Sequence, residues 1–209
     1  MPTQLNVGDA IRYGWSKFSR NAGVWIGFMV AVFVIEAVIG IIFDGFRPSD
    51  EFTVWRFIGT IVTAIVGYLI HAAYIRGALA EIDGNRPAFG TFFQFTNVAA
   101  VIIAGVLVSI ATAIGLVVLI VGAFVVIFLT WWTIPFIIDR NQDAITAIKS
   151  SIKAISSNVG TLLLLALAVV GLNIVGALLC GLGLLVSLPV TIIASTYAYR
   201  VTTGGSVAP

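Results

Sequence analysis

Two stretches of this chain, 98–138 and 159–199, each run for 41 residues without a charged side chain. As one helix, either stretch would be about 61 Å long at 1.5 Å per residue. The hydrocarbon core of a bilayer is only about 30 Å thick. Each stretch therefore predicts a helical hairpin. We expect the first hairpin to turn between Gly115 and Gly122, and the second at Cys180–Gly183.

Two further apolar runs, about 22–43 and 57–80, end at polar stretches and bring the expected number of membrane-spanning helices to six. Hydrophobic residues make up 60% of the chain and charged residues 10%, which excludes a soluble globular domain. No small-residue cleavage site follows the first run, so it is not a removable signal peptide. The sequence predicts an all-α polytopic membrane bundle of three hairpins, with one membrane domain over 1–200 and a flexible tail over 201–209.

Lysine and arginine are distributed unevenly around six spans. Only Arg47 and Arg56 lie on one side, and nine basic residues lie on the other. Because basic residues collect in cytoplasmic loops, both termini are expected in the cytoplasm and the protein in the cytoplasmic (inner) membrane. The nine are Arg12, Lys17, Arg20, Arg76, Arg86, Arg140, Lys149, Lys153 and Arg200.

A basic amphipathic segment occurs twice, as AIRYGWSKFSRNAG over 10–23 and AIKSSIKAISSNVG over 147–160. Each copy precedes an apolar run, so each predicts a short helix lying in the cytoplasmic interface. Its apolar stripe in the first copy is Val7, Ala10, Ile11, Trp15 and Phe18. These helices could simply anchor the spans, or they could form a surface for anionic lipid or a partner protein. The candidate residues of that surface are Arg12, Lys17, Arg20, Lys149 and Lys153.

A weaker third copy, the aromatic segment 88–95, suggests three repeat units of about 7–80, 88–138 and 144–200. Each unit would consist of an interfacial helix and a hairpin, all in the same orientation. An asparagine stands at the foot of each odd-numbered span, and a polar residue follows fifteen positions later. The pairs are Asn21 and Glu36, Asn97 and Thr112, and Asn158 and Asn173.

The junction motifs resemble those of a bacterial family that includes the membrane domain attached to some glycerophosphoryl diester phosphodiesterases, and related uncharacterised actinobacterial membrane proteins. The resemblance covers nearly the whole chain and implies the fold. The phosphodiesterase activity of the fused members lies in a separate soluble domain, so the resemblance implies no enzyme activity. The motifs are Gly14-Trp15-x-x-Phe18-x-x-Asn21-x-Gly23, Ile82-Asp-Gly-Asn-Arg-Pro-Ala-Phe-Gly-Thr-Phe-Phe93, Ile138-Asp-Arg140, Cys180-Gly-Leu-Gly-Leu-Leu185 with Pro189, and Tyr199-Arg200.

Glu36 is the leading candidate for an intramembrane functional residue, because a carboxyl in mid-span is costly. It could bind a proton or a cation, or it could be a neutral acid hydrogen-bonded to Thr60 or Thr63. The candidate polar site comprises Glu36, Thr112, Asn173 and His71. His71 is expected more than 10 Å from Glu36 along the membrane normal. Asn173 is expected to hydrogen-bond between helices.

Catalytic chemistry has little support in this sequence. Cys180 is the single cysteine and His71 the single histidine, which excludes a disulfide within the chain and a multi-cysteine metal site. No nucleophile elbow, zinc-protease motif or phosphate loop is present. We expect no enzyme activity, no cofactor and no metal. The net charge of +2 does not favour nucleic acid.

The sequence favours a non-catalytic inner-membrane protein, either an accessory subunit or a lipid-interacting scaffold of envelope machinery. Its expected partners are anionic membrane lipids and a membrane protein partner or a second copy of the chain. A small transporter or channel with a polar site around Glu36 is the alternative, and a lipid-acting membrane enzyme is a distant third.

Overall fold

A computed structural model of the chain describes residues 5–45, 53–118 and 120–209, and these residues contain helices and loops but no strand. The helical character predicted from the apolar runs is therefore confirmed. The elements are α1 (Val7–Arg20), α2 (Ala22–Asp44), α3 (Val54–Ile82), the 3-10 helix η1 (Phe89–Phe93), α4 (Val98–Val118), α5 (Ile120–Leu129), α6 (Thr133–Arg140), α7 (Ala144–Ser156), α8 (Val159–Leu178) and α9 (Leu184–Thr202).

Six segments within the described residues are long and apolar enough to cross a membrane, which confirms the expected number. Five of them are the single helices α2, α3, α4, α8 and α9, and α9 continues through Pro189. The sixth, Ile120–Arg140, consists of α5 and α6. The helices change direction where glycines suggested turns: Gly115 packs directly against Gly122, and Gly176 against Gly183.

The interruption between α5 and α6 is held together by α7. The hydroxyl of Ser151 donates a 2.8 Å hydrogen bond to the carbonyl of Leu129 and accepts a 3.1 Å bond from the backbone N–H of Trp132. Both backbone groups would otherwise be unsatisfied in an apolar surrounding. Trp132 itself is buried, with its ring 5.8 Å from that of Tyr199. One side chain on α7 thus fixes this break in the fourth span.

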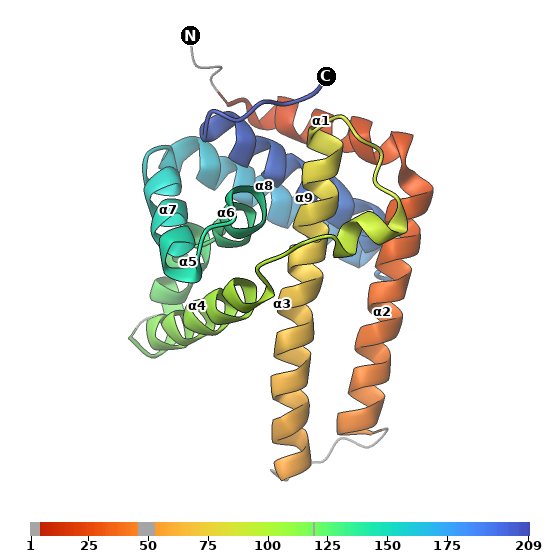
Figure 1. Cartoon of the computed structure of the whole chain (residues 1–209), viewed down its shortest axis with the longest axis vertical. Helices are drawn as coiled ribbons and strands as arrows, with labels where there is room; N and C mark the ends of the chain where they lie inside the picture. The colour runs from red at the N-terminus through yellow and green to blue at the C-terminus, as the bar shows by residue number, and fades with distance from the viewer. Residues whose placement is uncertain (1–4, 46–52, 119) are drawn as a thin grey trace.

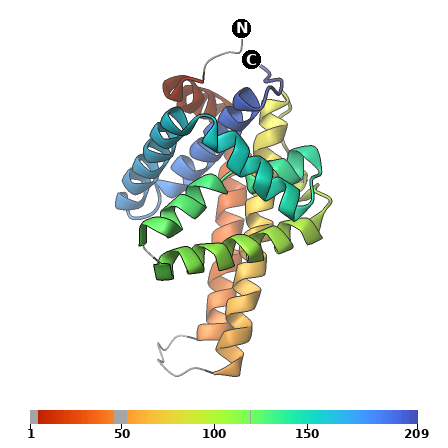
Figure 2. The same cartoon turned by 90° about the vertical axis from the view of Figure 1, so that its left-hand side faces the viewer.

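The packed end of the molecule, called the base from here on, has α3, α6 and α9 at its centre, and a short helix covers each of them. Buried residues are concentrated in the carboxyl half of α3, in α6 and in α9, whose ribbons can be followed by colour in Figure 2. Helix α1 packs on α9, where Gly14 lies directly against the Val190 carbonyl. Helix α7 packs on α6, and η1 packs on α3, where Gly77 admits the ring of Phe92.

Each of these central helices ends at a left-handed residue: Gly84 after α3, Asn141 after α6 and Gly204 after α9. After α3 and α9 the backbone bonds form the same Schellman ending, with Gly84 and Gly204 at C′. The structure of residues 201–209 differs from the flexible tail that the sequence predicted. Helix α9 continues to Thr202, and the remainder runs beside α1 (Figure 1), where the Ala208 N–H donates to the Ile82 carbonyl at 2.8 Å.

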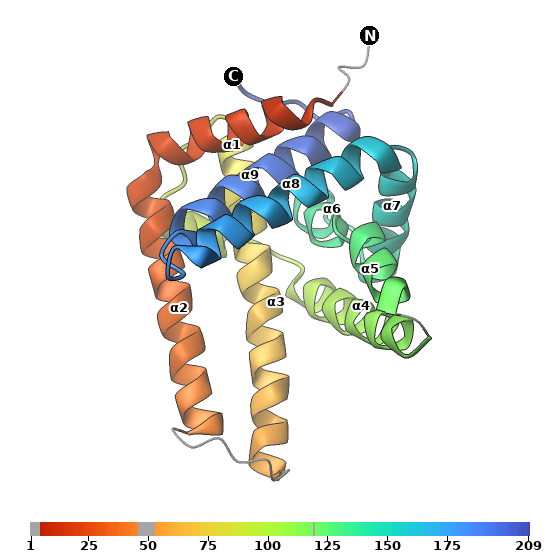
Figure 3. The same cartoon turned by 180° about the vertical axis from the view of Figure 1, so that it is seen from behind.

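The apolar helix pairs diverge from this base. Helices α2 and α3 project beyond the other elements, while α4 with α5 and α8 with α9 cross their direction (Figures 1 and 3). The α8–α9 turn reaches the middle of α2, since Leu182 and Val34 line one hollow. The far ends of the pairs expose apolar side chains, with Val117 87% and Leu178 77% exposed. The base is therefore packed by protein, and these far ends are not.

Candidate functional site

The ends of the three central helices meet in a charged cluster. Arg200 Nη2 of α9 lies 2.7 Å from Asp139 Oδ1 of α6 and 3.0 Å from Asp83 Oδ1 at the end of α3. The hydroxyl of Tyr199 donates to the other Asp139 oxygen at 2.9 Å. The Arg200 and Asp139 side chains are 12% and 15% exposed, so this cluster is largely removed from water. It ties the base together, and each of its charges has a partner.

A second polar cluster lies beside it, where α1 joins α2. The Glu81 carboxyl of α3 accepts hydrogen bonds from Trp25 Nε1 at 3.1 Å and from Asn21 Nδ2 at 3.2 Å. Asn21 also donates to the carbonyl of Pro87 at 3.0 Å. The asparagine at the foot of the first span therefore fastens α2 to the end of α3, and it does not cap α2.

Lys17 is buried in this region, contrary to its expected place on a lipid-facing surface. Its ammonium donates a 2.8 Å hydrogen bond to the carbonyl of Pro209 and lies 5.1 Å from the centre of the Tyr13 ring. Burial lowers the pKa of Lys17, Arg20 lowers it further, and Glu81 opposes the shift. The cause of its burial is the covering segment 203–209, which sequence periodicity could not place.

A pocket of about 340 Å³ opens between these elements. Its cationic lining residues are Lys17, Arg20 and Arg86, and its one carboxyl side chain is that of Glu81. Arg20 and Arg86 are exposed and have no hydrogen-bond or ion-pair partner within 5–45, 53–118 and 120–209. The remaining wall consists of Gly84, Asn85, Ala208 and Pro209.

The other expected basic residues lie on exposed helix faces. Arg12 has a side chain that is 83% exposed and forms only a 3.6 Å ion pair with Asp9 on its own helix. It lies one helical turn before Trp15, a residue of the apolar stripe that is exposed. The helix instead packs through Ala10, Gly14, Lys17 and Phe18.

Helix α7 repeats this arrangement at aligned positions. Lys149, aligned with Arg12, and Lys153 are exposed, and Ile152, aligned with Trp15, is exposed beside them. The packed face of α7 consists of Ala144, Ala147, Ser151 and Ile155. Both helices therefore present basic and apolar side chains together on the face that does not pack on the base.

The expected intramembrane polar site is not assembled as one unit. Glu36 is half-buried on α2, lines none of the five pockets described here, and has no hydrogen-bond partner among the described residues. Thr60, proposed as its partner, donates instead to the carbonyl of Arg56. Thr112 donates to the carbonyl of Val108 within its own helix. These two candidates therefore stand apart.

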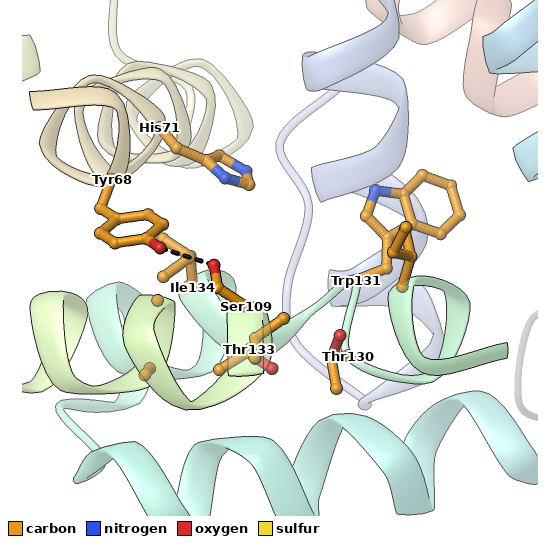
Figure 4. A pocket seen from close by; sticks show the side chains of 11 residues that line it. Tyr68, His71, Ser109, Thr130, Trp131, Thr133 and Ile134 are labelled. Atoms are coloured by element: carbon orange, nitrogen blue, oxygen red, sulfur yellow. Dashed lines mark hydrogen bonds between the residues drawn. The ribbon is translucent and has the colours of Figure 1, made fainter. Parts of the chain in front are cut away.

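His71 and Asn173 do come together, at two adjoining cavities. The first, of about 210 Å³, lies between α3, α4, α5 and α6 (Figure 4). There the His71 ring faces the open space beside Tyr68, whose hydroxyl is 2.6 Å from that of Ser109. The second, of about 190 Å³, shares His71 and Trp131 with the first and includes Asn173. Neither cavity is lined by an ionic side chain, counting His71 as neutral.

Asn173 forms the expected bond between helices, donating from Nδ2 to the Thr191 hydroxyl at 3.1 Å. Its amide oxygen is buried without a partner in the described part of the chain. Thr191 also donates to the backbone next to Pro189, whose ring removes one helix bond. This contact secures α8 on α9.

The residues that sequence analysis missed are the acidic ends of the central helices. Asp83, Asp139 and Glu81 looked like ordinary span boundaries in the sequence. Their shared signal was that each closes the second span of a unit, as Arg200 does, but an acidic residue at a span end is too common to reveal a pairing. Arg86 was counted for orientation and lies in one of the junction motifs, but it was not assigned to a site.

Comparison with known proteins extends along nearly the whole chain. This chain is 29% identical over 236 aligned positions to an uncharacterized protein, Rv2560, of Mycobacterium tuberculosis. The alignment covers 99% of this chain and 73% of that protein. The same values hold for the uncharacterized protein Mb2590 of Mycobacterium bovis. No family model matches, and no solved structure matches. The chain is thus similar to mycobacterial proteins whose names describe no activity, and the expected likeness to a phosphodiesterase-linked domain stays a prediction.

Proposed function

We propose that this protein is a non-catalytic inner-membrane protein that interacts with anionic lipids at the cytoplasmic interface through α1 and α7. The observation that carries the proposal is the pairing of exposed basic and apolar side chains on both helices: Arg12 with Trp15, and Lys149 and Lys153 with Ile152. A helix of this kind lies with its apolar side chains among the acyl chains and its basic ones among headgroups.

We further propose that the chain consists of three units, each with a short interfacial helix and an apolar hairpin. Support comes from aligned positions of α1 and α7: Ala10 and Ala147 are both fully buried, and Phe18 and Ile155 are both buried. Support also comes from cyclic packing, in which the short helix of each unit covers the second span of the preceding unit. All three hairpins would cross the bilayer, since each of their six segments is long and apolar enough to span it.

The lipid role is tested by purifying the full chain in mild detergent and identifying the retained lipids by native mass spectrometry. Lys149→Glu combined with Lys153→Glu should reduce retained anionic lipid, because each basic residue near an anionic leaflet contributes about 1 kcal/mol. Lys149→Arg with Lys153→Arg is the matched control and should retain it. Equal retention by the two variants would refute the role of α7. A co-purifying stoichiometric membrane protein would instead support the accessory-subunit form.

The transporter alternative has one observation in its favour, the two cavities that meet at His71 and Trp131. A transport site would then centre on His71 and not on Glu36. Flux measured in liposomes should fall for His71→Phe and should be unchanged for Glu36→Gln. Flux that depends on Glu36 alone would contradict this placement.

A further inference from the structure

We propose that the pocket lined by Lys17, Arg20 and Arg86 binds a phosphate group, and that its natural source is the headgroup of an anionic phospholipid. This inference deepens the lipid interaction proposed above and rests on it for the source of the phosphate. It assigns a specific site to the end of the molecule where α1, α2 and α3 meet.

The charge in the pocket is unbalanced. Among the side chains that line the pocket, three are cationic and one is a carboxyl, and Glu81 already accepts bonds from Trp25 and Asn21. The nearby Asp83 is paired with Arg200. A buried cation requires a compensating partner, and anions make charge-assisted hydrogen bonds about twice as strong as neutral acceptors do. The pocket is therefore short of negative charge.

Lys17 is the buried cation of the pocket. The side chain is 6% exposed, and its ammonium donates one hydrogen bond, to the main-chain oxygen of Pro209, the last residue of the sequence. An ammonium has three donors, so a phosphate oxygen beside it would add a charge-assisted hydrogen bond. Ala208 and Pro209 form one wall of the pocket, so a bound phosphate would contact the segment that now holds Lys17.

Geometry and location favour phosphate carried by a lipid. Arg20 and Arg86 are exposed at the rim, and guanidinium groups bind phosphate with two parallel hydrogen bonds. Helix α2 begins at Ala22, close to Arg20, and has no side-chain cap, so its dipole adds positive potential there. The volume of about 340 Å³ lies within the range of small-ligand pockets, roughly 300–1,000 Å³. The exposed Trp15 on α1, the helix that carries Lys17 and Arg20, would lie at headgroup level.

The test measures binding to the full chain in mild detergent. Phosphatidylglycerol, phosphatidylcholine and inorganic phosphate are added separately, and thermal stability is recorded over a concentration series. Phosphatidylglycerol should raise the melting temperature saturably and phosphatidylcholine should not. Arg20→Gln combined with Arg86→Gln should weaken the apparent affinity at least about tenfold, from two basic groups near the headgroup. Both residues lack partners, so the variant should melt normally without ligand. If it does not, Arg86→Gln alone is measured, with about a fivefold loss expected.

Arg12→Gln is the matched control, because it removes the same charge from the same helix outside the pocket. It should weaken affinity less than Arg20→Gln alone. Phosphatidylglycerol binding that is insensitive to Arg20 and Arg86 but sensitive to Lys149 and Lys153 would overturn the pocket and leave the proposed lipid role intact. If no lipid selectivity is found, the lipid role fails. In that case, saturable inorganic phosphate binding lost in the double variant supports a site for soluble phosphate, and its absence overturns the site.

Discussion

Arg200→Met is the perturbation that should most weaken the base. Arg200 contacts Asp139 at 2.7 Å and Asp83 at 3.0 Å, so its loss leaves two carboxylates near each other without a cation. A pair of charges about 4 Å apart interacts by about 4 kcal/mol at an effective dielectric constant of 20. Breaking a buried pair costs about 3–5 kcal/mol. Because Asp83 is 37% exposed and partly screened, we expect a loss of about 3 kcal/mol.

The free energy of unfolding is measured by SDS titration in mixed micelles, followed by tryptophan fluorescence. Adding Asp139→Asn to Arg200→Met removes one uncompensated charge and should recover about half of the loss, since Tyr199 can still donate to the amide oxygen. Arg12→Met is the control, and as an exposed pair it should change stability by less than about 1 kcal/mol. A loss below about 1 kcal/mol for Arg200→Met, or additive losses in the double variant, would refute the claim that Arg200 stabilises the base by pairing with Asp139 and Asp83.

Three further predictions concern the short helices. Ser151→Ala should cost about 1–3 kcal/mol in the same titration, because Leu129 and Trp132 lose their partner; exposed Ser156→Ala should cost little. Gly14→Ala should cost about 1–3 kcal/mol by forcing α1 off the Val190 carbonyl, whereas Gly27→Ala, with open space around it, should not destabilise. Hydrogen bonds from Thr146 and Ile145 lower the pKa of Asp143, so its contribution is present above the unfolded pKa of about 3.9 and is lost as pH falls through the folded value. The protection factors of the α7 amides, which are corrected for the intrinsic exchange rate at each pH, should therefore fall in acid for the wild type, and Asp143→Asn should remove this pH dependence.

The apolar runs determined more of the fold than any other feature. Their length predicted six spans because a bilayer fixes how long a crossing helix must be. The faces of α1 and α7 were less predictable, since a helix between protein and lipid has two apolar environments. Trp15 and Phe18 look equivalent in the sequence, yet Phe18 packs inside and Trp15 is exposed.

The candidate sites were predictable only in part. The basic character of α1 and α7 follows from composition and spacing. The burial of Lys17 and the approach of Arg200 to Asp83 depend on contacts between residues more than 100 positions apart, which no local pattern encodes. Asn173 was recognised because an amide in mid-span needs a partner, whereas the partner itself, Thr191, came from the packing of α8 on α9.

The orientation of the hairpins is the central claim, and the single cysteine tests it directly. Cys180 is exposed at the α8–α9 turn. The turn joins the ends of α8 and α9 that lie away from the basic residues. In intact cells, a membrane-impermeant maleimide should label Cys180 from outside. In a Cys180→Ser background, Ser156→Cys should be labelled only in inverted vesicles. Labelling of both positions from the cytoplasmic side, or of Cys180 only after detergent solubilisation, would contradict a spanning α8–α9 hairpin with its basic base in the cytoplasm.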